Sequence, residues 1–378
     1  MKFIIQKDYL VRSVNDVLKA ISGKTTIPIL SGIKITLTKE GVTLTGSDSD
    51  ISIESFIPKE EAGDEIVEIF EVGSIVLQAR FFADIVKKLP KDEVEIETTS
   101  NLVTFIRSGK AEFNLNGLDA EEYPQLPQIT DERIIRIPTD LLKQIVRQTV
   151  FAISTSETRP ILTGVNWSID NSLLTCIATD SHRLALRKAP VETTNEESYN
   201  IVIPGRSLNE LSKILDDSAD NVEIVITENQ VLFKTKHLLF FSRLLDGNYP
   251  DTTRLIPTEK KTEILVQAKE FLHAIDRASL LAREGKNNVV KLTTLEDNAV
   301  EISSNSPEIG KVTEELSCQV TTDEDLTISF SAKYMMDALK ALEGSDISIT
   351  FTGAMRPFLL RSVTDERILQ LILPVRTY

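Results

Sequence analysis

Asp180, Ser181 and His182 bring together the three residue types of a hydrolytic triad. Such a triad works only when the nucleophile, the base and the orienting acid lie along one chain of hydrogen bonds. Side chains of consecutive residues point in different directions and cannot meet that geometry, so we exclude hydrolysis. Two interpretations stay open: Asp180 caps a turn by accepting hydrogen bonds from nearby backbone amides, or the segment from His182 to Leu184 belongs to a binding surface.

The other residues that could act in catalysis or bind a metal are scattered along the sequence. His237 and His273 have no second ligand at metal-binding spacing, and Cys176 and Cys318 stand far apart in the sequence, which favours neither a disulfide framework nor a zinc site. The sequence contains no GxxxxGK[ST] loop, no GxGxxG motif and no paired-carboxylate signature. We therefore expect a protein that is not an enzyme and that uses no cofactor and no metal.

Length and composition indicate a soluble protein of two or three domains. The chain has 378 residues, of which 41% are hydrophobic and 26% charged, as in ordinary globular proteins. No apolar run approaches the roughly 20 residues that span a bilayer, and the start MKFIIQKDYLVRSV lacks the apolar core of a signal peptide. We expect a cytoplasmic location and no membrane partner. The net charge of −15 taken alone argues against nucleic acid as a ligand.

The sequence repeats itself. PILSGIKI at Pro28 returns as PILTGVNW at Pro160, an offset of 132 residues, and the triplet that begins at Ser47 returns with the same offset at Thr179. A third, weaker copy begins at Glu263. Self-similarity at a fixed period identifies a protein built from repeated structural units, so this pattern governs the fold prediction.

Each repeat has the same predicted order: a strand, a helix, a series of alternating strands, a second helix and further strands. Two helices on about eight antiparallel strands give an α+β class, with one face of the strands on the helices and the other facing solvent or a partner. The predicted helices lie within residues 8–24, 78–91, 139–159, 205–217, 269–286 and 332–343.

Charge is divided unevenly between these helices and the rest of the chain. The six helical windows hold 18 Lys and Arg against 13 Asp and Glu, a balance of +5, which leaves −20 elsewhere. Arg80, Arg206 and Lys333 share one repeat position at a helix N-terminus, where the helix dipole disfavours a cation. Either these cations serve a purpose outside the helix, or they stand there as good helix formers on a solvated face.

Several of these motifs together resemble a known family. The three-fold repeat, the MKF start, PIL followed by Gly, ATD-x-HRLA, YPD…IP and a C-terminal PxR are similar to those of bacterial sliding clamps, the β subunits of DNA polymerase III. The resemblance covers the whole chain. It implies three clamp domains, at residues 1–127, 128–257 and 258–378, in a ring-shaped head-to-tail homodimer that encircles double-stranded DNA without reading its sequence.

The resemblance also implies site residues. It places DNA contacts at Lys24, Arg80, Ser156 and Arg206. It places a dimer contact between Phe113 and Leu115 of one subunit and Leu280 and Leu281 of the other. The implied pocket for partner peptides comprises Leu162, Thr179, Ser181, His182, Arg183, Leu184, Pro250, Arg254, Leu255, Leu371, Leu373, Pro374, Val375 and Arg376.

The implied function is to tether the replicative polymerase for processive synthesis, with a clamp loader opening the ring. The replicative polymerase catalytic subunit, the clamp loader, and repair and translesion polymerases would bind through a short linear motif. The implied location is the cytoplasm, at the nucleoid. An alternative from another class is a repeat scaffold that forms no ring and binds only linear peptide motifs.

Overall fold

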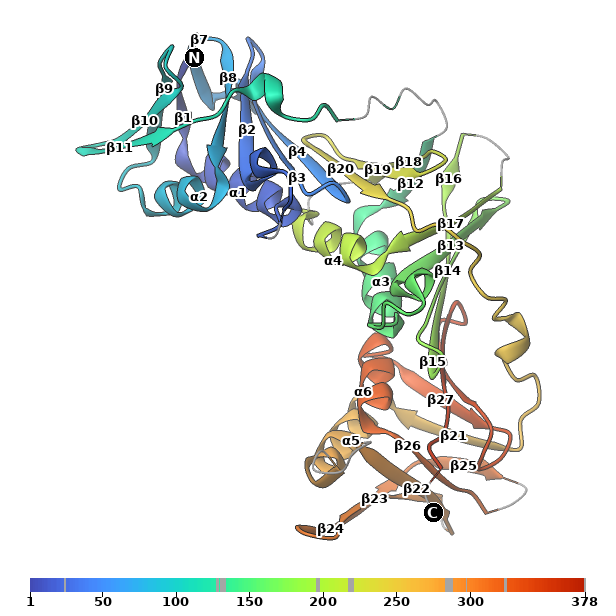
Figure 1. The fold of residues 1–378 in the computed structure, drawn as a ribbon. Helices are drawn as coiled ribbons and strands as arrows, with labels where there is room; N and C mark the ends of the chain where they lie inside the picture. Colours follow the sequence, from blue (N-terminus) through green and yellow to red (C-terminus); the bar gives the residue numbers. More distant parts are fainter. Residues whose placement is uncertain are drawn as a thin grey trace. The chain divides into compact units, whose positions relative to one another are not determined.

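The computed structural model describes residues 1–23, 25–126, 129, 134–194, 198–216, 221–282, 288–296, 298–322 and 325–376. Three times along the chain the described elements follow one order: a strand, a helix, a run of strands, a second helix and three closing strands (Figure 1). This order confirms the predicted three-fold repeat and its α+β class.

The elements of the three repeats are as follows. The first repeat contains β1 (Lys2–Gln6), α1 (Lys7–Val17), β2 (Gly32–Leu37), β3 (Gly41–Ser47), β4 (Ile51–Pro58), β5 (Glu60–Glu61), β6 (Asp64–Glu65), β7 (Val67–Glu71), β8 (Gly73–Gln78), α2 (Ala79–Lys88), β9 (Glu93–Thr98), β10 (Val103–Ser108) and β11 (Ala111–Asn116). The second contains β12 (Ile134–Pro138), α3 (Thr139–Thr149), β13 (Gly164–Asp170), β14 (Leu173–Thr179), β15 (Arg183–Pro190), β16 (Glu192–Thr193), β17 (Tyr199–Pro204), α4 (Gly205–Ile214), β18 (Asn221–Ile226), β19 (Gln230–Lys234) and β20 (Leu238–Arg243). The third contains β21 (Thr262–Gln267), α5 (Ala268–Ala282), β22 (Val289–Leu295), β23 (Ala299–Ser306), β24 (Gly310–Ser317), β25 (Gln319–Thr322), β26 (Thr327–Ser331), α6 (Ala332–Ala341), β27 (Asp346–Phe351), β28 (Phe358–Ser362) and β29 (Ile368–Ile372).

By their contacts the residues form two compact units. The first comprises Met1–Thr139, Thr193–Asn195 and Glu210–Leu244, and the second comprises Asp140–Glu192, Glu196–Asn209 and Leu245–Tyr378. The second repeat contributes to both units.

The first unit contains a five-stranded and a nine-stranded antiparallel sheet. Their strand orders are β11-β10-β9-β1-β7 and β16-β12-β18-β19-β20-β4-β3-β2-β8. Helices α1 and α2 lie side by side, and α1 contacts β1 of the smaller sheet as well as β3 and β4 of the larger one (Figure 1). The larger sheet is shared by two repeats, because β20 of the second repeat pairs with β4 of the first. We call this pairing the first join.

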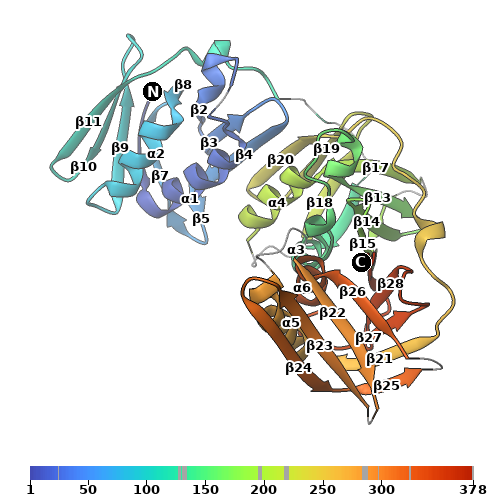
Figure 2. The same ribbon diagram turned by 60° about the horizontal axis from the view of Figure 1, so that its bottom comes forward.

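The second unit repeats the arrangement. Its sheets have the orders β17-β13-β14-β15-β29-β28-β27-β21-β25 and β24-β23-β22-β26, and α5 packs on β22, β23 and β24 (Figure 2). Here β29 of the third repeat pairs with β15 of the second, with Arg183 opposite Ile372 and Arg187 opposite Ile368. We call this pairing the second join.

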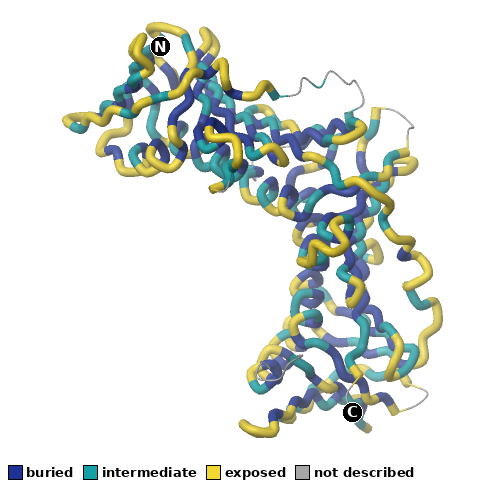
Figure 3. Tube along the Cα trace, in the orientation of Figure 1, coloured by how far each residue is buried: buried dark blue, intermediate teal, exposed yellow. Residues whose placement is uncertain are grey.

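Burial follows the predicted alternation. Buried residues lie along the strands and on the sheet-facing sides of the helices, whereas turns are exposed (Figure 3). The core of the third repeat contains a group of aromatic rings in which Phe358 lies 5.1 Å from Phe351 and 5.7 Å from Phe330 between centroids. Such burial of apolar surface supplies most of the driving force for folding.

The repeated sequence motifs adopt the same local structures. Pro28–Ser31 and Pro160–Thr163 each form a short 3-10 helix, and in both the final hydroxyl donates to the proline carbonyl, at 2.6 and 2.7 Å. These short helices lie outside the six predicted helical windows. Strand β8 leads directly into helix α2.

Arg183 ties the start of β15 to helix α6 and thereby fixes the geometry of the second join. Its Nε donates to Asp180 at 2.9 Å, its Nη1 to Asp337 on α6 at 2.6 Å, and its Nη2 to the carbonyl of Phe151 at 2.5 Å. The guanidinium also lies 4.4 Å from the centroid of the Tyr334 ring. A buried arginine needs such complete pairing, since an uncompensated buried charge is strongly destabilising.

Replacement of Arg183 should therefore destabilise the protein. We expect Arg183→Ala to lower the free energy of unfolding by about 3–5 kcal/mol, because the carboxylates of Asp180 and Asp337 lose their partner. The midpoint of thermal unfolding of the full-length chain measures the effect. Arg254→Ala is the matched control, because the Arg254 side chain is 92% exposed and its loss should leave the midpoint nearly unchanged. Equal midpoints for the two variants would contradict the role assigned to Arg183.

Candidate binding surfaces

An apolar patch lies on the outer face of the second join. Leu184 stands directly opposite Leu371, which pairs in turn with Leu359, and these three form a cluster with Leu369. Arg183 reaches the helices, and successive residues of a strand point to opposite faces. The cluster that contains Leu184 therefore lies on the face of the sheet away from the helices.

The segment from Thr179 to Arg183 forms a tight turn beside this patch. The Oδ1 atom of Asp180 accepts hydrogen bonds from the backbone amides of His182 and Arg183, at 2.9 and 3.0 Å. This observation confirms the capped turn and leaves no triad geometry. The corresponding turn of the first repeat is built in the same way, since Asp48 Oδ1 accepts from the amides of Asp50 and Ile51.

Ser181 occupies the left-handed backbone region, with a φ of 77°. A non-glycine residue in this region costs on the order of 1 kcal/mol or more, so the turn carries backbone strain at Ser181. The hydroxyl of Thr179 donates to the Arg183 carbonyl at 2.6 Å and helps to hold the turn closed.

The C-terminal segment runs along this turn. Strand β29 ends at Ile372, after which the amide of Leu373 donates to the His182 carbonyl at 2.9 Å and the amide of Val375 donates to the Ser329 carbonyl at 2.8 Å. Leu373, Pro374 and Val375 are half-buried and Arg376 is exposed. Thr377 and Tyr378 lie outside the described residues.

The linker that follows β20 contributes the other predicted residues. The Tyr249 hydroxyl accepts a hydrogen bond from the amide of Thr179 at 3.0 Å, which anchors the linker beside the turn. Pro250, Arg254 and Leu255 are exposed, and Leu162 is buried in the 3-10 helix of the second repeat.

The structure thus joins Leu184, Leu371 and Leu373 in one cluster and links Thr179 and His182 to its edge. Arg183 differs from the rest of the predicted pocket, since its side chain faces the helices and acts by positioning the turn. Five cluster members were not predicted; they are Leu359, Leu369, Ile177, Leu186 and Ile256. The alternation of apolar residues along β14, β15 and β29 could have identified Ile177, Leu186 and Leu369.

The predicted DNA contacts lie at exposed positions. Arg80 is the second residue of α2 and Arg206 the second residue of α4, and Lys333 holds the same place in α6. All three are exposed, as is Ser156, whose hydroxyl lies 2.9 Å from that of Thr158. Lys24 lies outside the described residues. The shared helix position confirms the alignment of the repeats.

The predicted dimer residues also lie at the surface. Phe113, which is 40% exposed, and Leu115 lie on β11, an edge strand of the five-stranded sheet. Leu280 and Leu281 lie in the last turn of helix α5, and Leu280 is 60% exposed.

Nearby charges are paired within the chain. Glu112 accepts from Arg107 at 2.6 Å, and Glu314 accepts from Arg277 at 2.9 Å. The bond from Arg277 holds the pKa of the Glu314 carboxyl below its usual value. Glu314 is thus already paired within its own chain.

Among the described residues, no group of three or more His, Cys, Asp and Glu side chains could hold a metal ion. His237 precedes β20 rather than lying within a strand, and its Nε2 bonds Glu61 at 2.9 Å. Cys176 and Cys318 are free thiols.

In the part of the chain that the structure describes, no helix is long and apolar enough to cross a membrane.

Three family models match the chain in sequence. The N-terminal domain of the DNA polymerase III beta subunit matches residues 1–127, its central domain residues 136–251, and its C-terminal domain residues 253–376.

Named relatives and solved structures agree with these matches. The "Beta sliding clamp" of Bacillus subtilis is 69% identical over 378 residues, and that of Staphylococcus epidermidis is 53% identical over 378 residues; each match covers the full length of both proteins. The crystal structure of the DNA polymerase sliding clamp from Bacillus subtilis superposes with a TM-score of 0.96, and that of the beta subunit from DNA polymerase of Streptococcus pyogenes, 39% identical, with 0.94; both cover 100% of both chains. The chain therefore belongs to the family of DNA polymerase III beta subunits, the beta sliding clamps.

Proposed function

We propose that two copies of this chain close head to tail into a ring around duplex DNA and hold the replicative polymerase on its template. A sliding clamp is a non-catalytic processivity factor, so the chain contributes topology and docking rather than chemistry. The chain would act in the cytoplasm, at the nucleoid. We infer three domains, with the boundaries 1–127, 128–257 and 258–378.

The pattern of strand pairing carries the ring proposal. At each join the last strand of one repeat pairs with the third strand after the first helix of the preceding repeat, β20 with β4 and β29 with β15. The same rule applied to the first repeat would pair β11 with β24, and both are edge strands of their sheets. Exposed edges are ready templates for another chain. Pairing of β11 with β24 of a second copy would extend the same strand-pairing pattern from one chain to the next, head to tail.

The helices would face the DNA. The backbone amides at a helix N-terminus already attract phosphate, and Arg80, Arg206 and Lys333 add a cation to three of these termini. Contacts to phosphate carry no sequence information, so binding would be independent of sequence and the ring could slide. Ser156 would add a neutral contact, and Lys24 a further cation.

The patch on the second join would receive partners. We infer that the replicative polymerase catalytic subunit, the clamp loader, and repair and translesion polymerases insert apolar side chains of a short linear motif beside Leu184, Leu371 and Leu373. Recognition of such a short motif gives affinities near micromolar, about −8 kcal/mol. Partners could then exchange on one ring.

Retention on DNA of two topologies tests encirclement. Protein loaded by its clamp loader on nicked circular DNA should stay bound, and linearisation of half the sample should release it, because the ring slides off free ends. The bound fraction is followed by gel filtration. Equal retention on circles and linear DNA would mean ordinary affinity, and failure to load on either would favour a peptide-binding scaffold that forms no ring.

Phe113→Lys should convert the dimer into monomers, because a lysine ammonium would be buried without a partner in an apolar contact. Sedimentation velocity at about micromolar concentration measures the change. Phe70→Lys is the matched control, because Phe70 is 53% exposed on β7 at the opposite edge of the same sheet. If Phe113→Lys remains dimeric, or if both variants dissociate equally, the assigned interface is wrong.

Leu255→Lys should weaken binding of a fluorescent motif peptide at least about tenfold, because it places a charge at the edge of the apolar patch. Fluorescence anisotropy gives the dissociation constant. Val363→Lys is the control, since Val363 belongs to the same unit and is 55% exposed, against 50% for Leu255. Unchanged peptide affinity in Leu255→Lys would remove Leu255 from the docking site.

A further inference from the structure

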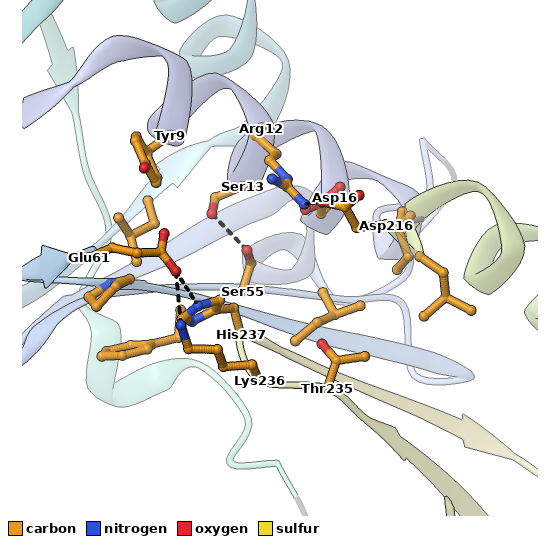
Figure 4. A pocket seen from close by; sticks show the side chains of 16 residues that line it. Tyr9, Arg12, Ser13, Asp16, Ser55, Glu61, Asp216, Thr235, Lys236 and His237 are labelled. Atoms are coloured by element: carbon orange, nitrogen blue, oxygen red, sulfur yellow. Dashed lines mark hydrogen bonds and ion pairs between the residues drawn. The ribbon is translucent and has the colours of Figure 1, made fainter. Parts of the chain in front are cut away.

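A cavity of about 410 Å³ lies beside the first join, within the first unit (Figure 4). One wall is the face of α1 that carries Tyr9, Arg12, Ser13 and Asp16. The remaining wall comes from β4 with Ser55, from Glu61, from residues 214–216 and from residues 235–238. This volume suits a small ligand or one long side chain.

Most polar groups in this cavity are already paired. The Oε1 atom of Glu61 accepts from Lys236 Nζ at 3.1 Å and lies 2.9 Å from His237 Nε2, while Arg12 forms an ion pair with Asp216 (Figure 4). The hydroxyls of Ser13 and Ser55 share a hydrogen bond of 2.7 Å. These contacts leave the cations Arg12 and Lys236 neutralised by carboxylates.

Asp16 differs from these groups. In the part of the chain that the structure describes, its carboxylate receives no hydrogen bond. Burial raises its pKa to about 6, and the carboxylate of Asp216 acts in the same direction, against the cations of Arg12 and Lys19. The cavity thus holds a half-buried acid for which α1, β4 and the segments around them supply no hydrogen-bonding partner.

The second join shows what fills the corresponding place in the next repeat. The amide of Phe56 donates to the His237 carbonyl at 2.8 Å, and the amide of Lys188 donates to the Arg367 carbonyl at 2.9 Å, so the two joins have the same register. Ser55 then corresponds to Arg187, the same offset of 132 residues found in the sequence. Arg187 is 4% exposed, and its Nη1 bonds Asp365 at 2.6 Å.

The two joins therefore distribute charge differently. The second join contains its own buried guanidinium, Arg187, and Gln148 stands at the position that corresponds to Asp16. The first join has a serine in place of that arginine, a cavity, and an acid in place of the glutamine. At the first join, a cavity and the negative charge of Asp16 therefore occupy the place where the second join has the side chain of Arg187.

From this correspondence we infer that the cavity binds a guanidinium group, supplied by an arginine side chain of a partner peptide or by a small free guanidine compound, which occupies the place of Arg187 and pairs with Asp16. The planar guanidinium suits paired recognition by carboxylates, and Glu61 lies across the cavity from Asp16 (Figure 4). Aromatic rings of Tyr9 and Phe56 line the site and offer a face for stacking.

Titration of the full-length protein with three matched probes tests this site. The probes are N-acetyl-arginine amide, the isosteric neutral N-acetyl-citrulline amide and N-acetyl-lysine amide, followed by NMR chemical shifts near the cavity. We expect saturable binding of the arginine probe and at least about tenfold weaker binding of the other two. Agmatine and an arginine tripeptide then distinguish a free compound from a peptide as the source. No saturable binding, or equal binding of the citrulline or lysine probe, would overturn the inference.

Two variants separate an effect on ligand binding from an effect on the stability of the fold. Asp16→Asn should weaken binding of the arginine probe at least about tenfold. Its thermal midpoint should nevertheless rise at pH 7.5, because a carboxyl whose pKa is raised in the folded state destabilises the fold once pH exceeds that pKa. Near pH 4 this gain should disappear. Ser55→Arg should fill the cavity from within and abolish binding.

Asp84→Asn, an exposed position on α2, is the control and should change neither binding nor the midpoint. If Asp16→Asn binds the arginine probe as tightly as the original protein, the assignment of Asp16 is wrong. Retention on circular DNA is measured in parallel, so that failure of this site and failure of the ring can be told apart.

Discussion

Antiparallel pairing between strands of neighbouring repeats organises both compact units. Backbone hydrogen bonds between β4 and β20, and between β15 and β29, turn separate sheets into two continuous nine-stranded sheets. The apolar patch around Leu184 and Leu371 lies on one join, and the cavity beside Asp16 lies at the other. Both candidate binding surfaces thus lie where two repeats meet rather than within any single repeat.

The two joins have the same backbone register but different side chains. At the second join Arg183 and Arg187 are buried and paired with carboxylates from the next repeat. At the first join the corresponding residues are Ile51, which is buried among apolar neighbours, and Ser55. Buried ion pairs and apolar packing can contribute similar net stability, because desolvation offsets most of the Coulomb attraction. Either chemistry can therefore stabilise a join, provided that the backbone register is kept and each buried charge keeps its partner.

Much of this fold can be predicted from the sequence. The offset between Pro28 and Pro160 identifies the repeat, and alternating β-branched residues identify most strands. The 3-10 helices at these prolines were not predicted, because their stability comes from a side-chain hydroxyl that bonds back to the proline carbonyl. Short turns of this kind leave no periodic signal.

The binding surfaces were predicted less completely. The pocket assigned by resemblance contains Leu184 and Leu371, yet it includes Arg183, whose side chain faces the helices. Residues such as Leu359 were missed because membership of the patch depends on which strands lie side by side. The cavity beside Asp16 could not be predicted at all, since it depends on the short side chain of Ser55 standing where the second join has an arginine. Pairings between strands distant in sequence are not encoded in any local pattern.

The joins also set the order in which the chain can fold during synthesis. The edge of β4, which ends at Pro58, finds its partner only when β20 begins at Leu238, and β15, which ends at Pro190, must wait for β29, which begins at Ile368. At about 5–20 residues per second each edge stays open on the ribosome for roughly 10–40 s. Unpaired edges are the surfaces through which nascent chains aggregate. Charged edge residues such as Glu54 on β4 oppose pairing with another nascent copy during this interval.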